Sequence, residues 1–161
     1  MQRVCGGLIL KRSHIAWFTI VTVFLLDRLT KFAITSYLDV GAVVPVVPGL
    51  FNIVHTRNTG AAFGLFSSGG SFSTMLLALV SAITVVVLLY FIREAKTGLQ
   101  VFAFSLITGG ALGNLFDRVV LGEVVDFLDF HAGSYHWPAF NVADSAITTG
   151  VLIAFFTFYR R

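Results

Sequence analysis

The chain alternates between four long apolar stretches and shorter segments that carry most of the polar residues. The apolar stretches run over about 15–37, 71–92, 99–120 and 141–159. Each is close to the roughly 20 residues that a helix needs to cross the hydrocarbon core of a bilayer. The pattern predicts four transmembrane helices that use nearly the whole chain, so we expect one integral-membrane domain over residues 1–161.

Two of the intervening segments have a different pattern. Residues 40–66 are rich in Val, Gly and aromatic residues, and Pro45 and Pro48 preclude a continuous helix there. The β-branched content predicts short strands. Residues 121–140 include VVDFLDF, in which apolar and acidic residues alternate loosely, as in an interfacial strand or an extended loop. The expected fold class is therefore an all-α membrane protein of four transmembrane helices, with a small strand element resting on one membrane face.

The composition also indicates a membrane protein. Hydrophobic residues make up 57% of the chain and charged residues only 12%, and the mean hydropathy is +0.88. A soluble domain is nearer half apolar and a quarter charged. The composition therefore disfavours a soluble globular domain of this length.

The positions of the basic residues predict the orientation of the chain in the membrane. Seven of the eleven Lys and Arg residues fall before the first apolar stretch, between the second and third, or after the last: Arg3, Lys11, Arg12, Arg93, Lys96, Arg160 and Arg161. Because cytoplasmic loops carry an excess of Lys and Arg, both termini are expected in the cytoplasm and residues 39–70 and 121–140 on the far side. These dispersed residues form no basic stripe, so no nucleic-acid partner is expected.

A set of polar side chains occupies the far-side ends of the apolar stretches and the loops beside them. Its members are Asp27, Asp117, Asp126, Asp144, Asn58, Asn114, Asn141 and Arg118. Seven of the eight acidic residues lie on this side, and only Glu94 lies on the cytoplasmic side. Because ionisable groups at membrane depth are costly, such a cluster indicates a functional site.

Asp126 and Asp144 are the best candidates for a catalytic pair. They lie 18 positions apart, and a loop of that length can fold back on itself. Two carboxylates held close together share one proton. The charged carboxylate can take a proton from a water that attacks a peptide carbonyl, while the protonated one bonds the carbonyl oxygen and later helps the amine to leave. Such a site needs neither a metal nor a cofactor.

Asp144 also has a structural interpretation. Asn141 followed by Asp144 resembles a helix N-cap with an acidic residue three positions later. The two interpretations are compatible, because the positive end of a helix favours a charged carboxylate. We therefore hypothesise that Asp144 carries the charge in the resting protein and that Asp126 carries the proton.

Two further groups of residues suggest helix packing. Asp27 and Lys31 are four positions apart, which predicts an ion pair near the interface, with Lys31 extending outward toward water. Gly109, Gly110 and Gly113 are small enough to allow close contact between helices. These residues are expected to support the fold.

The remaining polar residues of the far side give weaker signals. His55, His131 and His136 share that side, but their spacing matches no metal-binding motif, so no metal site is predicted. Asp129 alternates with Asp126 and is expected to be solvated.

Five motifs, in order, resemble those of the lipoprotein signal peptidase (signal peptidase II) family. They are DRLTK at 27–31, NTGAAFG at 58–64, GNLFDR at 113–118, VVDF at 124–127 and FNVADS at 140–145. The five together are far more specific than any one of them, and they cover nearly the whole chain. The resemblance implies an intramembrane aspartic peptidase of the bacterial inner membrane. Such an enzyme removes the signal peptide of prolipoproteins by cutting before a cysteine that bears diacylglyceryl.

The resemblance also implies roles for individual residues and the identity of partners. By position it makes Asp126 and Asp144 the catalytic dyad. Around them it implies lining or supporting roles for Asn58, Asn114, Arg118 and Asn141, and more structural roles for Asp27 and Asp117. The strand element resembles the family's cradle for the cleavage region of the substrate. The implied partners are the prolipoprotein, membrane lipid and the cyclic peptide antibiotic globomycin. One chain contains the whole set of motifs, so a monomer is expected.

Two other functions remain as alternatives. A small proton- or ion-coupled membrane transporter could use buried carboxylates as a proton relay. Against it, the acids gather at one end, and the second apolar stretch carries no charged residue. An intramembrane peptidase of the presenilin type is the other alternative, but its GxGD signature is absent from the sequence.

Overall fold

The computed structural model describes the backbone of residues 2–60 and 70–159 and, within these, the side chains of residues 12–60 and 72–159. Its helices are α1 (Gln2–Tyr37), α2 (Gly70–Glu94), α3 (Gly98–Val120) and α4 (Val142–Tyr159). The strands are β1 (Val43–Val47), β2 (Phe51–Asn58), β3 (Val124–Ala132) and β4 (Tyr135–His136). The predicted helices are confirmed to within a few residues at most ends. The exception is α1, which begins well before residue 15.

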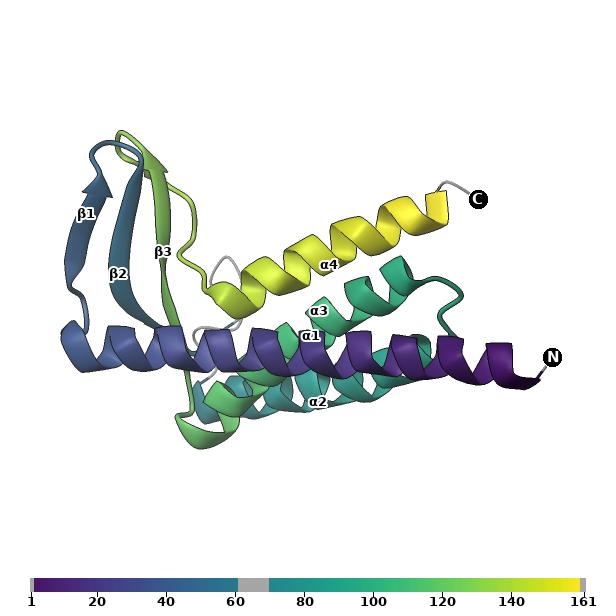
Figure 1. Ribbon diagram of the computed structural model, residues 1–161. Helices are drawn as coiled ribbons and strands as arrows, with labels where there is room; N and C mark the ends of the chain where they lie inside the picture. The colour runs from purple at the N-terminus through teal and green to yellow at the C-terminus, as the bar shows by residue number, and fades with distance from the viewer. Residues whose placement is uncertain (1, 61–69, 160–161) are drawn as a thin grey trace.

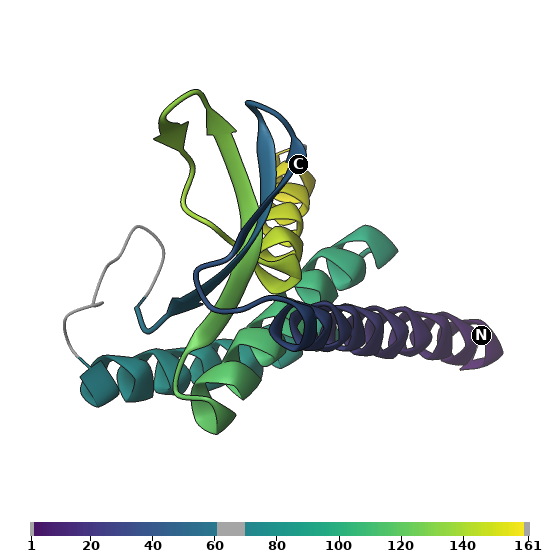
Figure 2. The same cartoon turned by 90° about the vertical axis from the view of Figure 1, so that its left-hand side faces the viewer.

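The helix bundle and the sheet occupy opposite ends of the molecule. Figure 1 shows both termini and the α2–α3 connection at one end and the strands at the other. The two ends of the molecule thus separate the same segments that the basic residues assign to opposite sides of a membrane; the orientation itself stays a prediction. Seen from the sheet in Figure 2, the strands lie across the end of the bundle, roughly crosswise to α1.

Within the described residues, three helices are long and apolar enough to cross a membrane: Phe72–Glu94, Gly98–Val120 and Val142–Tyr159. Helix α1 is not among them, and it carries Asp27, Arg28 and Lys31 in its second half. Helix α2 leaves large apolar side chains exposed, such as Met75, at 69% exposure, and Val86, at 67%. A contiguous apolar surface of this kind fits a lipid environment.

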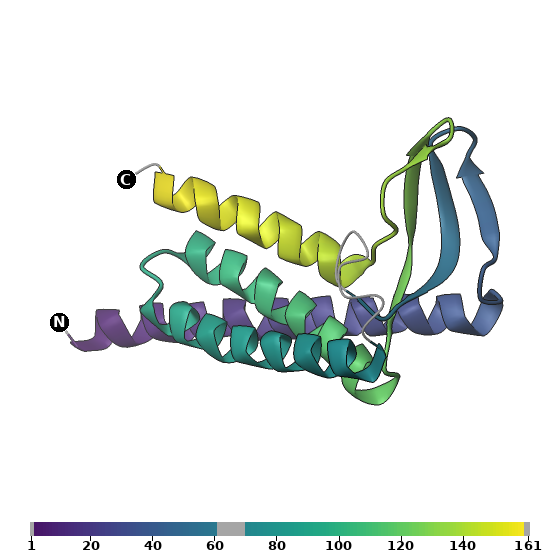
Figure 3. The same cartoon turned by 180° about the vertical axis from the view of Figure 1, so that it is seen from behind.

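Helix α3 is the centre of the bundle, because it packs against each of the other three helices. Figure 3 shows the first half of α3 lying between α4 and the other two helices and its last turns crossing past them. Glycines permit this packing. A Cβ atom at Gly109 would lie 2.8 Å from Cβ of Val23 in α1, and one at Gly113 would lie 2.6 Å from Oδ2 of Asp27. A Cβ atom at Gly110 would clash with the backbone oxygen of Ala143 in α4. The prediction of close helix contact at these glycines is confirmed.

The strands form one antiparallel order, β1-β2-β3-β4. The prediction of strands within 40–66 is confirmed by β1 and β2, and the segment 121–140 contains β3 and β4. The register pairs Thr56 of β2 with Asp126 of β3 and Asn58 with Val124. The paired strands extend to the end of the helix bundle, where β3 begins a few residues after the end of α3. The sheet thereby brings Asp126 to the start of α4.

Candidate active site

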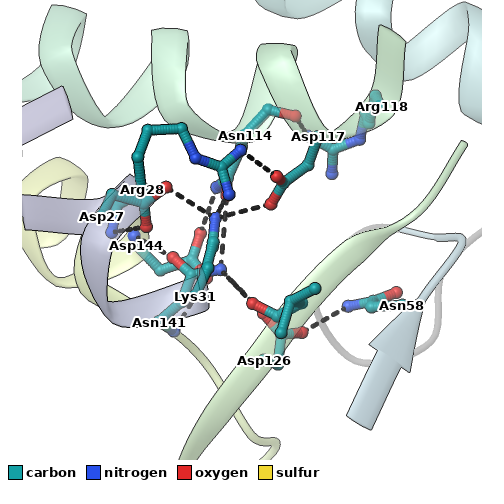
Figure 4. Close-up of polar contacts among 12 residues, drawn as sticks. Asp27, Arg28, Lys31, Asn58, Asn114, Asp117, Arg118, Asp126, Asn141 and Asp144 are labelled. Carbon is teal, nitrogen blue, oxygen red and sulfur yellow. Dashed lines mark hydrogen bonds and ion pairs between the residues drawn. The ribbon is translucent and has the colours of Figure 1, made fainter. Parts of the chain in front are cut away.

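Asp126 and Asp144 meet at the junction between the sheet and the bundle. Asp126 lies on β3 and is 3% exposed, and Asp144 lies in the first turn of α4. Both line one cavity of about 890 Å³. The other predicted site residues that line it are Asn58, Asn114 and Arg118. Figure 4 shows the polar contacts that join this group.

Asn141 connects the two carboxylates. Its side-chain nitrogen donates a hydrogen bond of 2.8 Å to Oδ1 of Asp126. Its side-chain oxygen accepts the backbone N–H of Asp144 at 2.9 Å, and Oδ2 of Asp144 accepts the backbone N–H of Asn141 at 3.3 Å. This reciprocal pair is a capping box, so the predicted N-cap is confirmed. The same side chain therefore begins helix α4 and holds Asp126.

Asp126 is held on both of its oxygens. Asn58 donates to Oδ2 at 3.1 Å, and the side-chain oxygen of Asn58 in turn accepts the backbone N–H of Gly60 at 2.9 Å. Burial, together with the negative charge of Asp144, raises the pKa of Asp126 to about 6, and the bonds from Asn58 and Asn141 only partly offset this. A carboxyl with such a pKa can hold and release a proton near neutral pH.

Both side-chain oxygens of Asp144 accept hydrogen bonds. Its Oδ1 accepts a hydrogen bond of 2.7 Å from the side-chain nitrogen of Asn114. Its Oδ2 accepts from the backbone of Asn141, at the positive end of α4. Since these groups act only as donors toward Asp144, they stabilise a carboxylate more than a carboxylic acid.

A buried charge network lies behind Asn114. Nζ of Lys31 is 2.8 Å from Oδ2 of Asp27 and 2.8 Å from Oδ2 of Asp117, and it donates to Oδ1 of Asn114 at 3.0 Å. Arg28 also forms an ion pair with Asp117. The network therefore fixes the side-chain oxygen of Asn114, which leaves its nitrogen directed at Asp144.

Lys31 corrects one expectation and adds a site residue that sequence reasoning missed. The predicted ion pair with Asp27 is confirmed, but the outward path of Lys31 is wrong, because its side chain is only 1% exposed and faces the bundle. Inside the bundle, Nζ of Lys31 contacts one oxygen each of Asp27, Asp117 and Asn114. These oxygens take the place of the water molecules that it would contact at the surface. The sequence does place Lys31 about one helical turn after Asp27, in the first apolar stretch. This spacing was the available indication that Lys31 belongs with the acidic residues of the site.

Asp27 and Arg118 connect this network to its surroundings. Oδ1 of Asp27 accepts the backbone N–H of Ala143, the second residue of α4, at 3.0 Å. Arg118 is half-buried and donates to the backbone oxygens of Asn114 and Gly60, each at 3.4 Å. Its guanidinium therefore contributes a positive charge to the wall of the cavity. Within the motif at 58–64, residues 61–64 lie outside the described residues.

Asp129 is a further correction. The expectation that it is solvated is wrong, because it is 7% exposed and lies outside the cavity. Asn52 donates to it at 2.8 Å, and the ring of His136 lies 2.9 Å from its Oδ1. Although burial alone would raise the pKa of Asp129, these two neighbours lower it. Among the described residues, no group of three or more His, Cys, Asp or Glu side chains is placed to hold a metal ion.

Comparisons with known proteins give a consistent result. The sequence model of the family described as Signal peptidase (SPase) II matches residues 19–160. A lipoprotein signal peptidase of Syntrophotalea carbinolica is 48% identical over 128 residues, which cover 78% of each chain. One of Syntrophus aciditrophicus is 43% identical over 136 residues, which cover 81% of this chain and 83% of that one. One of Francisella tularensis subsp. novicida is 41% identical over 148 residues, which cover 89% of this chain and 91% of that one.

Solved structures are similar as well. A bacterial membrane enzyme solved by the in meso method at 2.3 Å matches with a TM-score of 0.81 and 34% identity, covering 90% of this chain and 87% of that one. A second bacterial membrane enzyme, solved by the same method at 1.9 Å, matches with a TM-score of 0.77 and 34% identity. It covers 89% of this chain and 91% of that one.

Proposed function

The chain belongs to the signal peptidase II family, and from this premise we propose that it is an intramembrane aspartic endopeptidase. Its substrate is a prolipoprotein, and it removes the signal peptide by cutting before the cysteine that bears diacylglyceryl. The observation that carries the proposal is the bridge of Asn141 between Asp126 and Asp144. The bridge holds two carboxylates at the wall of one cavity, and the raised pKa of Asp126 supports a role for it as the acid.

In the proposed reaction, the charged Asp144 takes a proton from a water molecule, and the oxygen of that water attacks the scissile carbonyl carbon. Asp126 in its protonated form donates a hydrogen bond to the carbonyl oxygen. Negative charge develops on that oxygen as the tetrahedral intermediate forms. Asp144 then passes the proton that it took from the water to the amide nitrogen, so the C–N bond breaks, the amine leaves, and both carboxyl groups return to their starting states. The raised pKa of Asp126 and the donors around Asp144 support this division of roles.

The walls of the cavity fit a peptide that remains anchored in lipid. Its polar side includes Asn58 and Arg118, whose donors suit the backbone oxygens of an extended peptide. Its other side includes Phe140 of the connection before α4 and Ile147 of α4. We assign the apolar side to the signal helix and acyl chains and the polar side to the scissile segment. The strand element then acts as the cradle for the cleavage region. A globomycin-type cyclic peptide that occupies this cavity would block cleavage.

The proposed setting is the bacterial cell inner membrane. Helix α1 is proposed as the fourth span, with both termini in the cytoplasm and the carboxylate pair near the outer face. At that depth water can reach the scissile bond while the substrate stays in the bilayer. The whole site lies within one chain, which supports a monomer.

The test uses purified protein in proteoliposomes with a diacylglyceryl-modified prolipoprotein. Asp126→Asn and Asp144→Asn are each expected to lower the cleavage rate by at least about 10³-fold, because either change removes a proton acceptor or donor. Asp129→Asn is the matched control, since it makes the same chemical change on the same strand outside the cavity, and it is expected to keep most of the activity. Near-normal cleavage by either dyad variant, or proton flux without cleavage in the wild type, would contradict the proposal.

A further inference from the structure

A second cavity lies at the end of the bundle opposite the sheet. It is a groove of about 600 Å³ between the first half of α1 and the last turns of α2. Its walls include Trp17 and Ile20 of α1 and Leu89 and Ile92 of α2. The groove exists because α1 and α2 each pack on α3 rather than extensively on one another. Its floor contains small or fully buried side chains, such as Ala16 and Val101.

Two arginine side chains also line this groove. They are Arg12 and Arg93, and none of the described residues that line it is acidic. The acidic neighbour of Arg93, Glu94, lines a different cavity together with Phe91 and Phe158. Within the described part of the chain, Arg93 forms no ion pair. The groove therefore carries uncompensated positive charge beside an apolar channel.

Arg12 is held in place rather than extended into solvent. Its two terminal nitrogens donate to the backbone oxygens of Ala95, at 3.2 Å, and Lys96, at 2.6 Å. These bonds tie α1 to the chain that follows α2. The Nε atom of Arg12 is buried and has no hydrogen-bond partner among the described residues. A buried donor without a partner is costly, so a ligand oxygen at this point would be stabilising.

We propose that this groove binds one anionic phospholipid. The phosphate lies between Arg12 and Arg93, and an acyl chain follows the apolar wall made by Ile20 and Leu89. Basic pockets between transmembrane helices suit anionic lipid headgroups, and Trp17, at 63% exposure, has the amphipathic ring that favours the interface. The proposal depends on α1 crossing the bilayer beside α2, but it does not depend on the chemistry at Asp126 and Asp144.

The apolar wall distinguishes a lipid from a soluble anion. A free phosphate would use only the two arginines and would leave the channel of Ile20, Leu89 and Ile92 without an occupant. A phospholipid satisfies both parts at once, because its headgroup and acyl chain are covalently joined. A zwitterionic lipid would fill the channel, but its cationic group would weaken the interaction with two arginines.

The test is native mass spectrometry of the detergent-purified full chain, titrated with dioleoylphosphatidylglycerol and, separately, with dioleoylphosphatidylcholine. We expect one tightly bound phosphatidylglycerol and weaker, non-saturating phosphatidylcholine. Arg93→Gln is expected to weaken the first phosphatidylglycerol by about fivefold, the effect of one basic residue near a membrane surface. Arg93 is exposed, so this variant should fold, and an unchanged melting temperature checks that it does.

Lys96→Gln is the matched control. Lys96 lies at the same end of the bundle but lines the other cavity, with Glu94, so this variant removes the same charge without touching the groove. It is expected to leave the first lipid bound as in the wild type. An equal loss in both variants, or equal binding of the two lipids, would overturn the proposal in favour of general attraction to a basic surface. Displacement of the lipid by millimolar inorganic phosphate or glycerol phosphate would also overturn it, because the site would then be one for a soluble anion.

Discussion

The side-chain nitrogen of Asn141 donates a hydrogen bond of 2.8 Å to Oδ1 of Asp126. The residue that begins α4 is thereby also a residue that positions a carboxylate on β3. Because the cap fixes the side-chain oxygen of Asn141 on the backbone of Asp144, its nitrogen has only the direction of Asp126 and its neighbours left. The side chain of Asn141 therefore both caps α4 and positions Asp126. A substitution that removes only one of these contacts can separate the two roles.

Asn141→Asp is expected to keep the cap of α4 and lose the activity. Asp caps a helix about as well as Asn, but it cannot donate to Asp126 and adds a third carboxylate to the pair. Asn141→Ala is expected to lose both, with about 1 kcal/mol from the lost cap. Thermal unfolding and cleavage assays on the two variants check this. If Asn141→Asp cleaves as fast as the wild type, the bond to Asp126 has no role in catalysis.

The sequence predicted the helices well because a spanning segment must satisfy its backbone internally, so length and hydropathy nearly determine it. It also predicted the meeting of Asp126 and Asp144, since both are polar groups beside the ends of spans. The inward path of Lys31 could not be predicted from spacing. Asp27 lies on the same helix, but Asp117 and Asn114 come from α3, and only the packing of α1 on Gly109 and Gly113 brings them within reach.

Asp129 shows a similar limit on the sheet. Its partners, Asn52 and His136, lie on β2 and β4, and the register between strands decides whether they meet. Alternation along β3 alone predicts only that residues two apart share a face. From the sequence alone, an acidic residue in such a polar segment is expected to be exposed to solvent. The pairing of β2 with β3 instead places the side-chain amide of Asn52 beside Asp129.

The stability of the protein is expected to depend on pH through Asp126. Its pKa is raised from 3.8 to about 6 in the folded protein, so the folded state binds this proton more tightly than the unfolded chain. The free energy of unfolding should therefore fall as the pH rises from about 4 to 6, by up to about 3 kcal/mol from this group. Asp126→Asn should lack this contribution, so its stability relative to the wild type should increase with pH. Parallel pH dependences of the two proteins in thermal or denaturant unfolding would argue against a raised pKa.

Gly113→Ala is expected to destabilise the bundle by about 1–3 kcal/mol, the usual cost of overpacking. The added methyl would lie 2.6 Å from Oδ2 of Asp27, which also receives the ion pair from Lys31. Gly98→Ala in the same helix is the control, because among the described residues its methyl would meet Ile15 alone, at 3.9 Å. Unfolding measurements on both variants test the difference. Equal stability of the two would mean that α1 and α3 are not as close at Gly113 as described.

Lys31→Met tests the charge network behind Asn114. The change keeps most of the side-chain volume but leaves Asp27 and Asp117, both fully buried, without their shared cation. Breaking a buried ion pair from one side costs about 3–5 kcal/mol, because the remaining charge is uncompensated. We expect a lower melting temperature and slower cleavage, the latter because Asn114 loses the donor that fixes its oxygen.

Adding Asp27→Asn to Lys31→Met tests whether the lost stability comes from the unpaired charge of Asp27 or from the changed shape of the side chain at position 31. Asp117 keeps its ion pair with Arg28, so the carboxylate left without a cation is that of Asp27. The double variant removes this charge and should recover part of the stability that Lys31→Met loses. The amide oxygen of the substituted side chain can still accept the backbone N–H of Ala143, as Oδ1 of Asp27 does. Cleavage should recover less, since the bond from Lys31 to Asn114 remains absent. If the double variant is less stable than Lys31→Met by the full cost of Asp27→Asn alone, the two residues are not energetically coupled. Recovery of stability without recovery of cleavage would assign Lys31 a positioning role through Asn114 and Asp144.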